Sequence, residues 1–80
     1  MAQKYGLDNL IDYRIVVSGH LAENWHDWFN EKNVLIVSSS SKTNTTVLSG
    51  TFDQAGLLGL LRRLYSLGMP LISVNHYGKN

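Results

Sequence analysis

The side chains most able to do acid–base or metal chemistry in this chain are its three histidines: His20, His26 and His76. A helix that began early would place His20, Glu23 and Asp27 on one face at three- and four-residue spacing, which is a conceivable set of metal ligands. Gly19 disfavours a helix through His20, and this spacing is common by chance. We therefore interpret these three as surface residues and predict no metal site.

Catalysis by the histidines or by the hydroxyl side chains is not expected either. An enzyme that uses His26 or His76 as an acid–base group needs a pocket around it, and a chain of 80 residues has little room to enclose one. A nucleophilic serine needs a base and an orienting third group. The hydroxyl residues at 38–41 and 43–46 lie in no glycine-framed nucleophile elbow. We interpret them as a solvated hairpin loop and predict no catalytic residue.

The glycines and cations indicate no cofactor and no nucleic-acid partner. Neither of the two phosphate-binding glycine patterns occurs, and the G-L-L-G at 56–59 lies inside a helical pattern. Arg62 and Arg63, with Lys42 and Lys79, form at most a weak anion-attracting patch. The net charge is only +1, and charged residues make up 16% of the chain, so the basic surface of a nucleic-acid binder is missing.

Length and composition favour one small domain in a reducing compartment. Eighty residues make a single domain with a limited core, and such domains often gain stability from oligomerisation. Because the chain has no cysteine, a disulfide framework and a thiolate metal site are excluded. We see no signal peptide and no apolar run of membrane-spanning length. A cytoplasmic location with no membrane contact is the prediction.

The clearest element is a helix over about 54–67, with Asp53 as its N-cap and Gly68 as its C-terminal stop. Pro70 prevents the helix from continuing. Leu57, Leu61 and Leu64 form the centre of one apolar face, which is wide enough for a helix that lies on a sheet. The flanks of that face are also apolar: Leu58, Leu60, Tyr65 and Leu67.

The opposite side of this helix is unusually small, with two glycines that each cost about 0.5–1 kcal/mol relative to alanine. One interpretation is a tolerated surface cost. The other is that a backbone from a second subunit or a partner comes close there. This side is therefore the candidate interface: Ala55, Gly56, Gly59, Arg62, Arg63 and Ser66.

A second, shorter helix or pair of turns is predicted over 21–29, with Asn30 as a left-handed stop. Leu21, Trp25, Trp28 and Phe29 fall on one stripe. Two turns do not hold together alone in water, so these side chains must dock on something. We favour anchoring in the core over a ligand cage. The residues predicted to lie nearest any ligand are Trp25, His26, Trp28 and Asp53.

Strands are predicted over 13–17, 33–39, 45–52 and 71–77, with a polar leader at 1–12 and a polar tail at 78–80. Gly50 suggests a bulge in the third strand, whose inward side is left open between Leu48 with Phe52 and Val47 alone. The order strand, helix, strand, strand, helix, strand predicts one α+β domain over 13–77. Its expected architecture is a ferredoxin-like sandwich in which both helices cover one face of a four-stranded antiparallel sheet.

Two runs carry a resemblance to known proteins. The run D-Q-A-G-L-L-G-L-L-R-R-L-Y-S-L-G-M-P-L-I-S-V resembles a C-terminal signature, DQAxLxGLLxRLxxLGxPLISV, of a group of small uncharacterised bacterial proteins. E-N-W-H-D-W-F at 23–29 is similar to an upstream W-x-x-W-F element of that group. Gly56 departs from the alanine more usual there. The resemblance implies no particular activity.

A fainter similarity links the order of elements to ACT-type regulatory domains. It implies the binding of an amino acid or nucleotide at a subunit interface near 53–57. The D-x-x-G-x-L loop of those domains follows the first strand, whereas here it follows the third.

The leading functional expectation is a non-enzymatic interaction or regulatory domain that forms a homodimer, with an unidentified protein partner as a further expectation. An ACT-like small-ligand sensor is the alternative, and a small acid–base enzyme is the weakest of the three.

Overall fold

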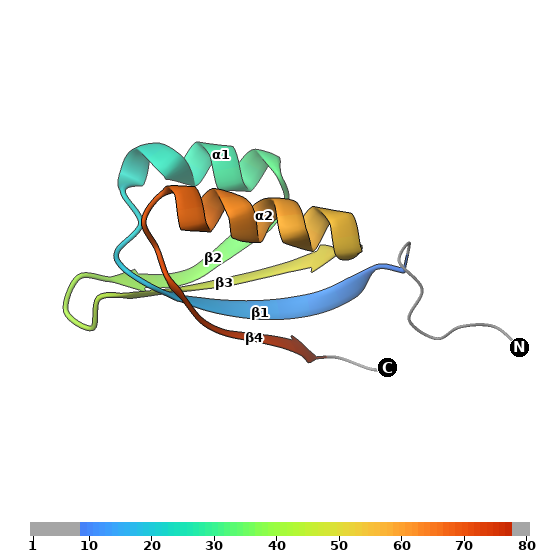
Figure 1. Cartoon of the computed structure of the whole chain (residues 1–80). Helices are drawn as coiled ribbons and strands as arrows, with labels where there is room; N and C mark the ends of the chain where they lie inside the picture. The colour runs from blue at the N-terminus through green and yellow to red at the C-terminus, as the bar shows by residue number, and fades with distance from the viewer. Residues whose placement is uncertain (1–8, 78–80) are drawn as a thin grey trace, which may run out of the picture.

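The computed structural model describes residues 9–77, which form four strands, two α-helices and one 3-10 turn (Figure 1). The elements in chain order are β1 (Ile11–Ser18), η1 (Glu23–Trp25), α1 (His26–Glu31), β2 (Val34–Ser40), β3 (Thr45–Phe52), α2 (Gln54–Ser66) and β4 (Leu71–Tyr77). The predicted tail at 78–80 and most of the predicted leader lie outside the described residues. The end of that leader belongs to β1, because Ile11 and Asp12 pair with Phe52 and Thr51.

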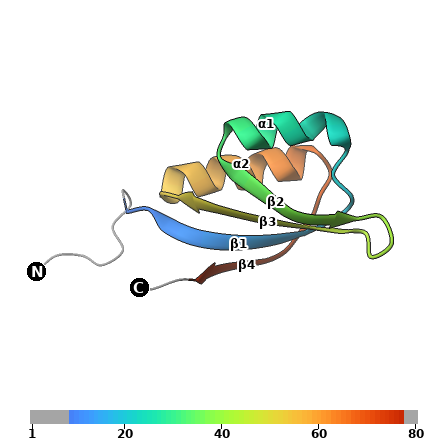
Figure 2. The same ribbon diagram turned by 180° about the vertical axis from the view of Figure 1, so that it is seen from behind.

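The four strands form one antiparallel sheet in the order β2-β3-β1-β4, so β2 and β4 are its edges. Both helices lie on the same face, with α1 over the β2 side and α2 over the β1 and β4 side (Figures 1 and 2). The α+β class and the four-stranded antiparallel sheet are confirmed. Neither of the helices within residues 9–77 is long and apolar enough to cross a membrane.

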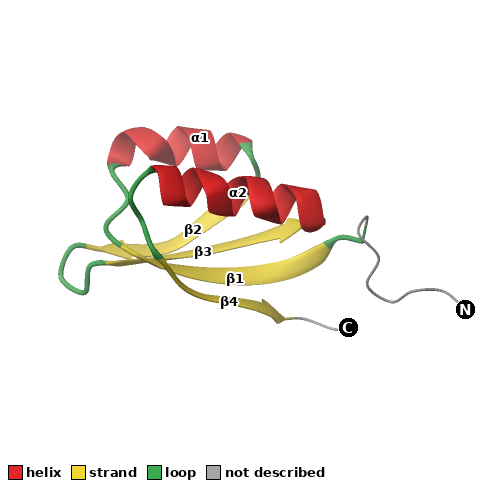
Figure 3. Ribbon diagram, in the orientation of Figure 1, coloured by secondary structure: helices red, strands yellow, loops and turns green. Residues whose placement is uncertain are grey.

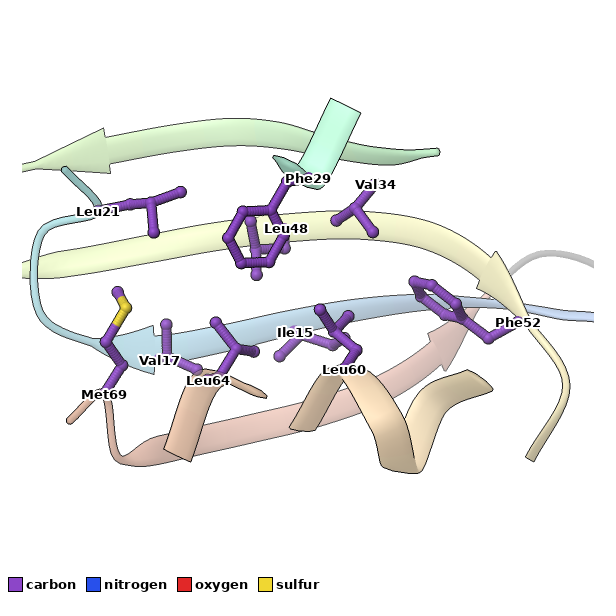
Figure 4. Packing of buried hydrophobic residues seen from close by; sticks show 10 residues of the cluster. All are labelled: Ile15, Val17, Leu21, Phe29, Val34, Leu48, Phe52, Leu60, Leu64 and Met69. Atoms are coloured by element: carbon purple, nitrogen blue, oxygen red, sulfur yellow. The ribbon is translucent and has the colours of Figure 1, made fainter. Parts of the chain in front are cut away.

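Alternation along the two central strands builds the core. Ile15 and Val17 of β1 are fully buried, and Leu48 of β3 lies opposite Ile15 in the ladder. Figure 4 shows these side chains pointing to the same side, where the helices cover them. Phe52 is also buried on that side. The open question about the third strand is thereby settled in favour of Leu48 with Phe52.

Helix α2 begins and ends as the sequence predicts. The Gly56 N–H donates to Asp53 Oδ1 at 2.7 Å, which caps the first turn. At the other end Gly68 has a φ of 78°, the left-handed conformation that glycine tolerates best. The N–H groups of Gly68 and Met69 donate to the carbonyls of Tyr65 and Leu64. This is a Schellman motif, and Met69 is buried beside the core.

The apolar face of α2 is rotated from the predicted one. Leu60 and Leu64 are buried, whereas Leu57 and Leu61 are only partly so. Leu58 is 49% exposed and Tyr65 is 81% exposed, although both were expected on the flank of the buried face. The buried face is therefore centred on Leu60 and Leu64. It is narrower than the apolar face that the leucines form on the helix.

The first helical segment starts and ends later than predicted. Leu21 and Phe29 are buried in the core, as the anchoring interpretation requires, but the segment opens with a 3-10 turn and continues through Glu31. Asn30 is helical and is not the stop. Asn33 takes the left-handed conformation, with a φ of 62°, and starts the turn into β2.

Gly50 does not mark a bulge. It pairs in regular register with Tyr13 and with Val34, and the irregularities lie between Ile36 and Ser38 and opposite Val16 and Val17. A Cβ at Gly50 would lie 2.6 Å from Cζ of Phe52. Glycine is required here because the Phe52 ring folds back over its backbone.

A partly buried chain of hydroxyls connects the β1–α1 loop to the β2–β3 hairpin. Both segments lie at the end of the sheet where α2 connects to β4 (Figure 3). The Leu21 N–H donates to Ser39 Oγ at 2.9 Å, and Ser39 Oγ lies 2.9 Å from Thr46 Oγ1. Thr46, which is fully buried, donates to the Gly19 carbonyl at 2.8 Å. Ser39 must therefore donate to Thr46, since each hydroxyl has one proton. These two hydroxyls are structural, which corrects their interpretation as solvated.

Replacing Thr46 with valine should lower the free energy of unfolding by about 1–3 kcal/mol, because the Gly19 carbonyl and the Ser39 hydroxyl lose their partner inside the protein. Urea titration followed by circular dichroism measures this. Thr43→Val is the matched control, because the Thr43 hydroxyl bonds Thr45 at the exposed hairpin turn. Its effect should stay within about 0.5 kcal/mol. Equal effects of the two substitutions would contradict a structural role for Thr46.

Candidate functional site

The most site-like feature of the described residues is a groove between α1 and α2, hereafter the inter-helix groove, with a volume of about 330 Å³. Its floor is formed by three buried apolar side chains, Val34 from β2, Phe52 from β3 and Leu60 from α2. Figure 4 shows all three at the same end of the core cluster. The floor is apolar because all three side chains belong to the hydrophobic core cluster.

Tryptophan and two cations form one part of the groove's wall. Trp28, Lys32 and Arg63 all line it. The Arg63 guanidinium carbon lies 5.2 Å from the centre of the Trp28 ring and 5.8 Å from that of Trp25. Lys32 Nζ lies 5.5 Å from the Trp28 ring. Cation–π attraction at such distances contributes about 0.5–1 kcal/mol at exposed sites and keeps both cations beside the groove.

Two glycines of α2 account for the open space. A Cβ at Gly59 would meet no atom within 4 Å, and Gly59 lines the groove with Gly56. A Cβ at Gly56 would lie 3.1 Å from the Asp53 oxygen that caps the helix. No backbone of the described chain approaches Gly59. Within residues 9–77 its small size therefore leaves the groove open and brings no second element close.

The predicted interface residues are all exposed and lie along one side of α2. Three of them, Gly56, Gly59 and Arg63, also line the inter-helix groove, together with residues from three other elements. Ala55, Arg62 and Ser66 are exposed outside the groove. Ser66 lines a separate hollow beside the α2–β4 turn, together with Tyr65.

The residues predicted to lie nearest a ligand are found at three different places in the structure. Trp25 and Trp28 lie near Arg63, and their own rings meet edge to face with centroids 6.2 Å apart. His26 instead lines a shallower hollow of about 260 Å³ on the β2 side of α1. The Asp53 carboxylate is engaged in capping α2 and is not among the groove-lining residues.

The residues considered for chemistry remain apart. His20 lies in the loop after β1, and no group of three possible metal ligands occurs among residues 9–77. His76 is on the edge strand β4, where its ring lies edge-on to Tyr13 at 6.5 Å. The structure brings His26 and His76 to different parts of the sheet, because α1 packs on β2 and β4 is the opposite edge.

Neither Lys32 nor the floor of the groove follows from the sequence pattern. Lys42, predicted to form an anion-attracting patch with Arg62 and Arg63, lies at the β2–β3 turn, and Lys79 is outside the described residues. One signal was present: Gly56, Gly59 and Arg63 recur at three- and four-residue spacing and so share one side of α2. Nothing in the sequence showed that α1 would face that side.

The residues that line the groove lie within a known protein family. A family model described as "Domain of unknown function (DUF8691)" matches residues 12–75, so the chain belongs to this family. The matched range contains all four strands in large part, both helices and all the groove-lining residues. No curated protein and no solved structure matches the chain.

Replacing Gly59 with alanine should raise the free energy of unfolding by about 0.5–1 kcal/mol, because the methyl group meets nothing and alanine is the better helix former. Thermal or urea unfolding measures the change. Gly56→Ala should gain less, since its methyl group crowds the capping Asp53 oxygen. Gly50→Ala should destabilise the protein by about 1–3 kcal/mol, because it displaces the Phe52 ring. A loss of stability in Gly59→Ala would show that something else occupies this space.

Proposed function

We propose that this chain is a small, cytoplasmic, non-enzymatic interaction or regulatory domain that works as a homodimer. The observation that carries the proposal is a set of apolar side chains that the described chain leaves about half exposed or more. It is formed by exposed side chains of α2 and of the neighbouring edge strand β4. We call it the outer flank, and its members are Leu58, Tyr65, Leu71 and Ile72.

Helix geometry supports the position of this flank. At 3.6 residues per turn, each residue is rotated by about 100°, so Leu58 and Tyr65 point about 200° away from Gly56 and Arg63. Since Gly56 and Arg63 face the inter-helix groove, Leu58 and Tyr65 face away from α1. That is the β4 side of the sandwich, where Leu71 and Ile72 are 52% and 54% exposed.

The edge strand gives such an interface its hydrogen bonds. Within residues 9–77, β4 pairs only with β1, so its other side presents backbone groups to an incoming strand. Two copies of β4 related by a two-fold axis pair antiparallel and join two sheets into one. The same contact covers the outer flanks of both subunits. Ala55, Arg62 and Ser66 then lie at the rim of the interface.

We also propose the finer fold as a ferredoxin-like sandwich. Read from β4, the strands run 4-1-3-2. β1 and β2 are parallel to one another with β3 between them, and β3 and β4 are parallel with β1 between them. This is the split β-α-β arrangement, in which each helix crosses over one intervening strand.

The inter-helix groove favours a second function, the sensing of a small ligand. The ACT-type resemblance implies such sensing at a subunit interface near 53–57, whereas this groove lies between two helices of one chain. Its volume of about 330 Å³ is at the lower end of the range for small-molecule sites. Apolar walls with a few polar groups are typical of such sites. The groove lies within one chain, so this function does not depend on the homodimer.

Size-exclusion chromatography with light scattering should give the mass of two chains at micromolar concentration. Ile72→Lys should shift the protein to the mass of one chain, because it places a charge in the covered flank. Leu35→Lys is the matched control, since Leu35 is 66% exposed on the opposite edge strand β2, and it should leave the dimer intact. A monomer at high micromolar concentration would overturn the homodimer.

A further inference from the structure

We infer that the inter-helix groove binds a small apolar monocarboxylate, an anion with one carboxylate on an apolar body of about ten non-hydrogen atoms. The inference rests on the small-ligand function proposed above and names its ligand class. It does not depend on the homodimer.

The charge of the groove selects an anion. Lys32 and Arg63 both line it, and both are held beside the Trp28 ring. No aspartate or glutamate is among the described residues that line it. A carboxylate matches the planar fork of an arginine guanidinium, which forms paired hydrogen bonds with it. Burial of the ligand's apolar part would strengthen this ion pair by excluding water.

The same charge argues against a free amino acid. The α-ammonium group of an amino acid would lie near the two cations of the groove. No acidic side chain among the lining residues could accept a hydrogen bond from it. Like charges so placed disfavour binding. A nucleotide fits less well too, since several phosphate charges face only two cations. The simple carboxylate is therefore favoured over both ligands that the ACT-type resemblance implies.

The size and lining of the groove set the body of the ligand. A volume of about 330 Å³ is at the lower end of the range for small-molecule sites, which favours a small body of about ten non-hydrogen atoms. The floor consists of Val34, Phe52 and Leu60, and Trp28 forms part of the wall. An aromatic or short aliphatic body would cover these apolar groups and displace water from them.

The probe for this inference is 3-phenylpropionate, titrated into the full chain and followed by tryptophan fluorescence. Both tryptophans of the protein lie beside Arg63, so binding changes their environment. We expect saturable binding with a dissociation constant at least tenfold below those of 3-phenylpropionamide, which lacks the charge, and of phenylalanine, which adds the ammonium. Inorganic phosphate at equal concentration should leave the fluorescence unchanged.

Two matched pairs of variants locate the site. Arg63→Gln should weaken binding of 3-phenylpropionate at least tenfold, while Arg62→Gln, one residue away but not lining the groove, should not change it. Gly59→Leu should abolish binding because its side chain fills the groove, and Ala55→Leu should not. Circular dichroism and thermal unfolding check that all four variants fold.

Three results would overturn the inference. The first is no saturable binding at millimolar 3-phenylpropionate, and the second is equal affinity for the amide or for phenylalanine. The third is an equal loss of affinity in the two variants of either pair. Failure here is separable from failure of the homodimer. A dimer that does not bind 3-phenylpropionate would contradict only the proposed ligand. A monomer that binds it would contradict only the proposed homodimer. Tighter binding of phosphate than of the carboxylate would indicate a phosphate site instead.

Discussion

The packing of α2 onto one face of the sheet is the contact on which the rest of this structure depends. Leu60 and Leu64 of the helix are buried against Ile15, Val17 and Leu48 of the two central strands. Each fully buried leucine contributes about 1.5–3 kcal/mol, and a domain has a net stability of only about 5–15 kcal/mol. A small number of such contacts therefore decides whether the chain folds. The cap at Asp53 and the turn at Gly68 fix where this helix begins and ends.

The two helices cover unequal parts of one face of the sheet. The inter-helix groove and the outer flank both result from this arrangement. Helix α1 is short and packs at the β2 edge, while α2 lies on the β1 and β4 side. Because Gly56 and Gly59 carry no side chains, the space between the helices stays open as the inter-helix groove. On the opposite side of α2, Leu58 and Tyr65 remain 49% and 81% exposed. A longer first helix or a larger residue at position 59 would remove the groove.

Gly50, Gly59 and Gly68 differ in the physical reason for which the position carries a glycine. Gly50 is needed because the Phe52 ring occupies the place of its Cβ, and Gly68 because its backbone is left-handed. Gly59 has neither reason, and a helix interior with glycine is less stable than one with alanine by about 0.5–1 kcal/mol. The proposed ligand would occupy the space that Gly59 leaves, which would give this cost a functional reason.

Local sequence determined which elements form and where α2 begins and ends, because these features depend on neighbours a few residues away. The pattern D-Q-A-G followed by leucines predicted the cap and the helix, and Gly68 with Pro70 predicted its stop. Alternation predicted all four strands, although β1 begins earlier, at Ile11. Tertiary structure decided which leucines of α2 are buried, that Thr46 is internal, and that Lys32 and Arg63 flank one tryptophan. These outcomes depend on the rotation of each helix on the sheet and on contacts between distant segments, for which the spacing of residues along the chain contains no information.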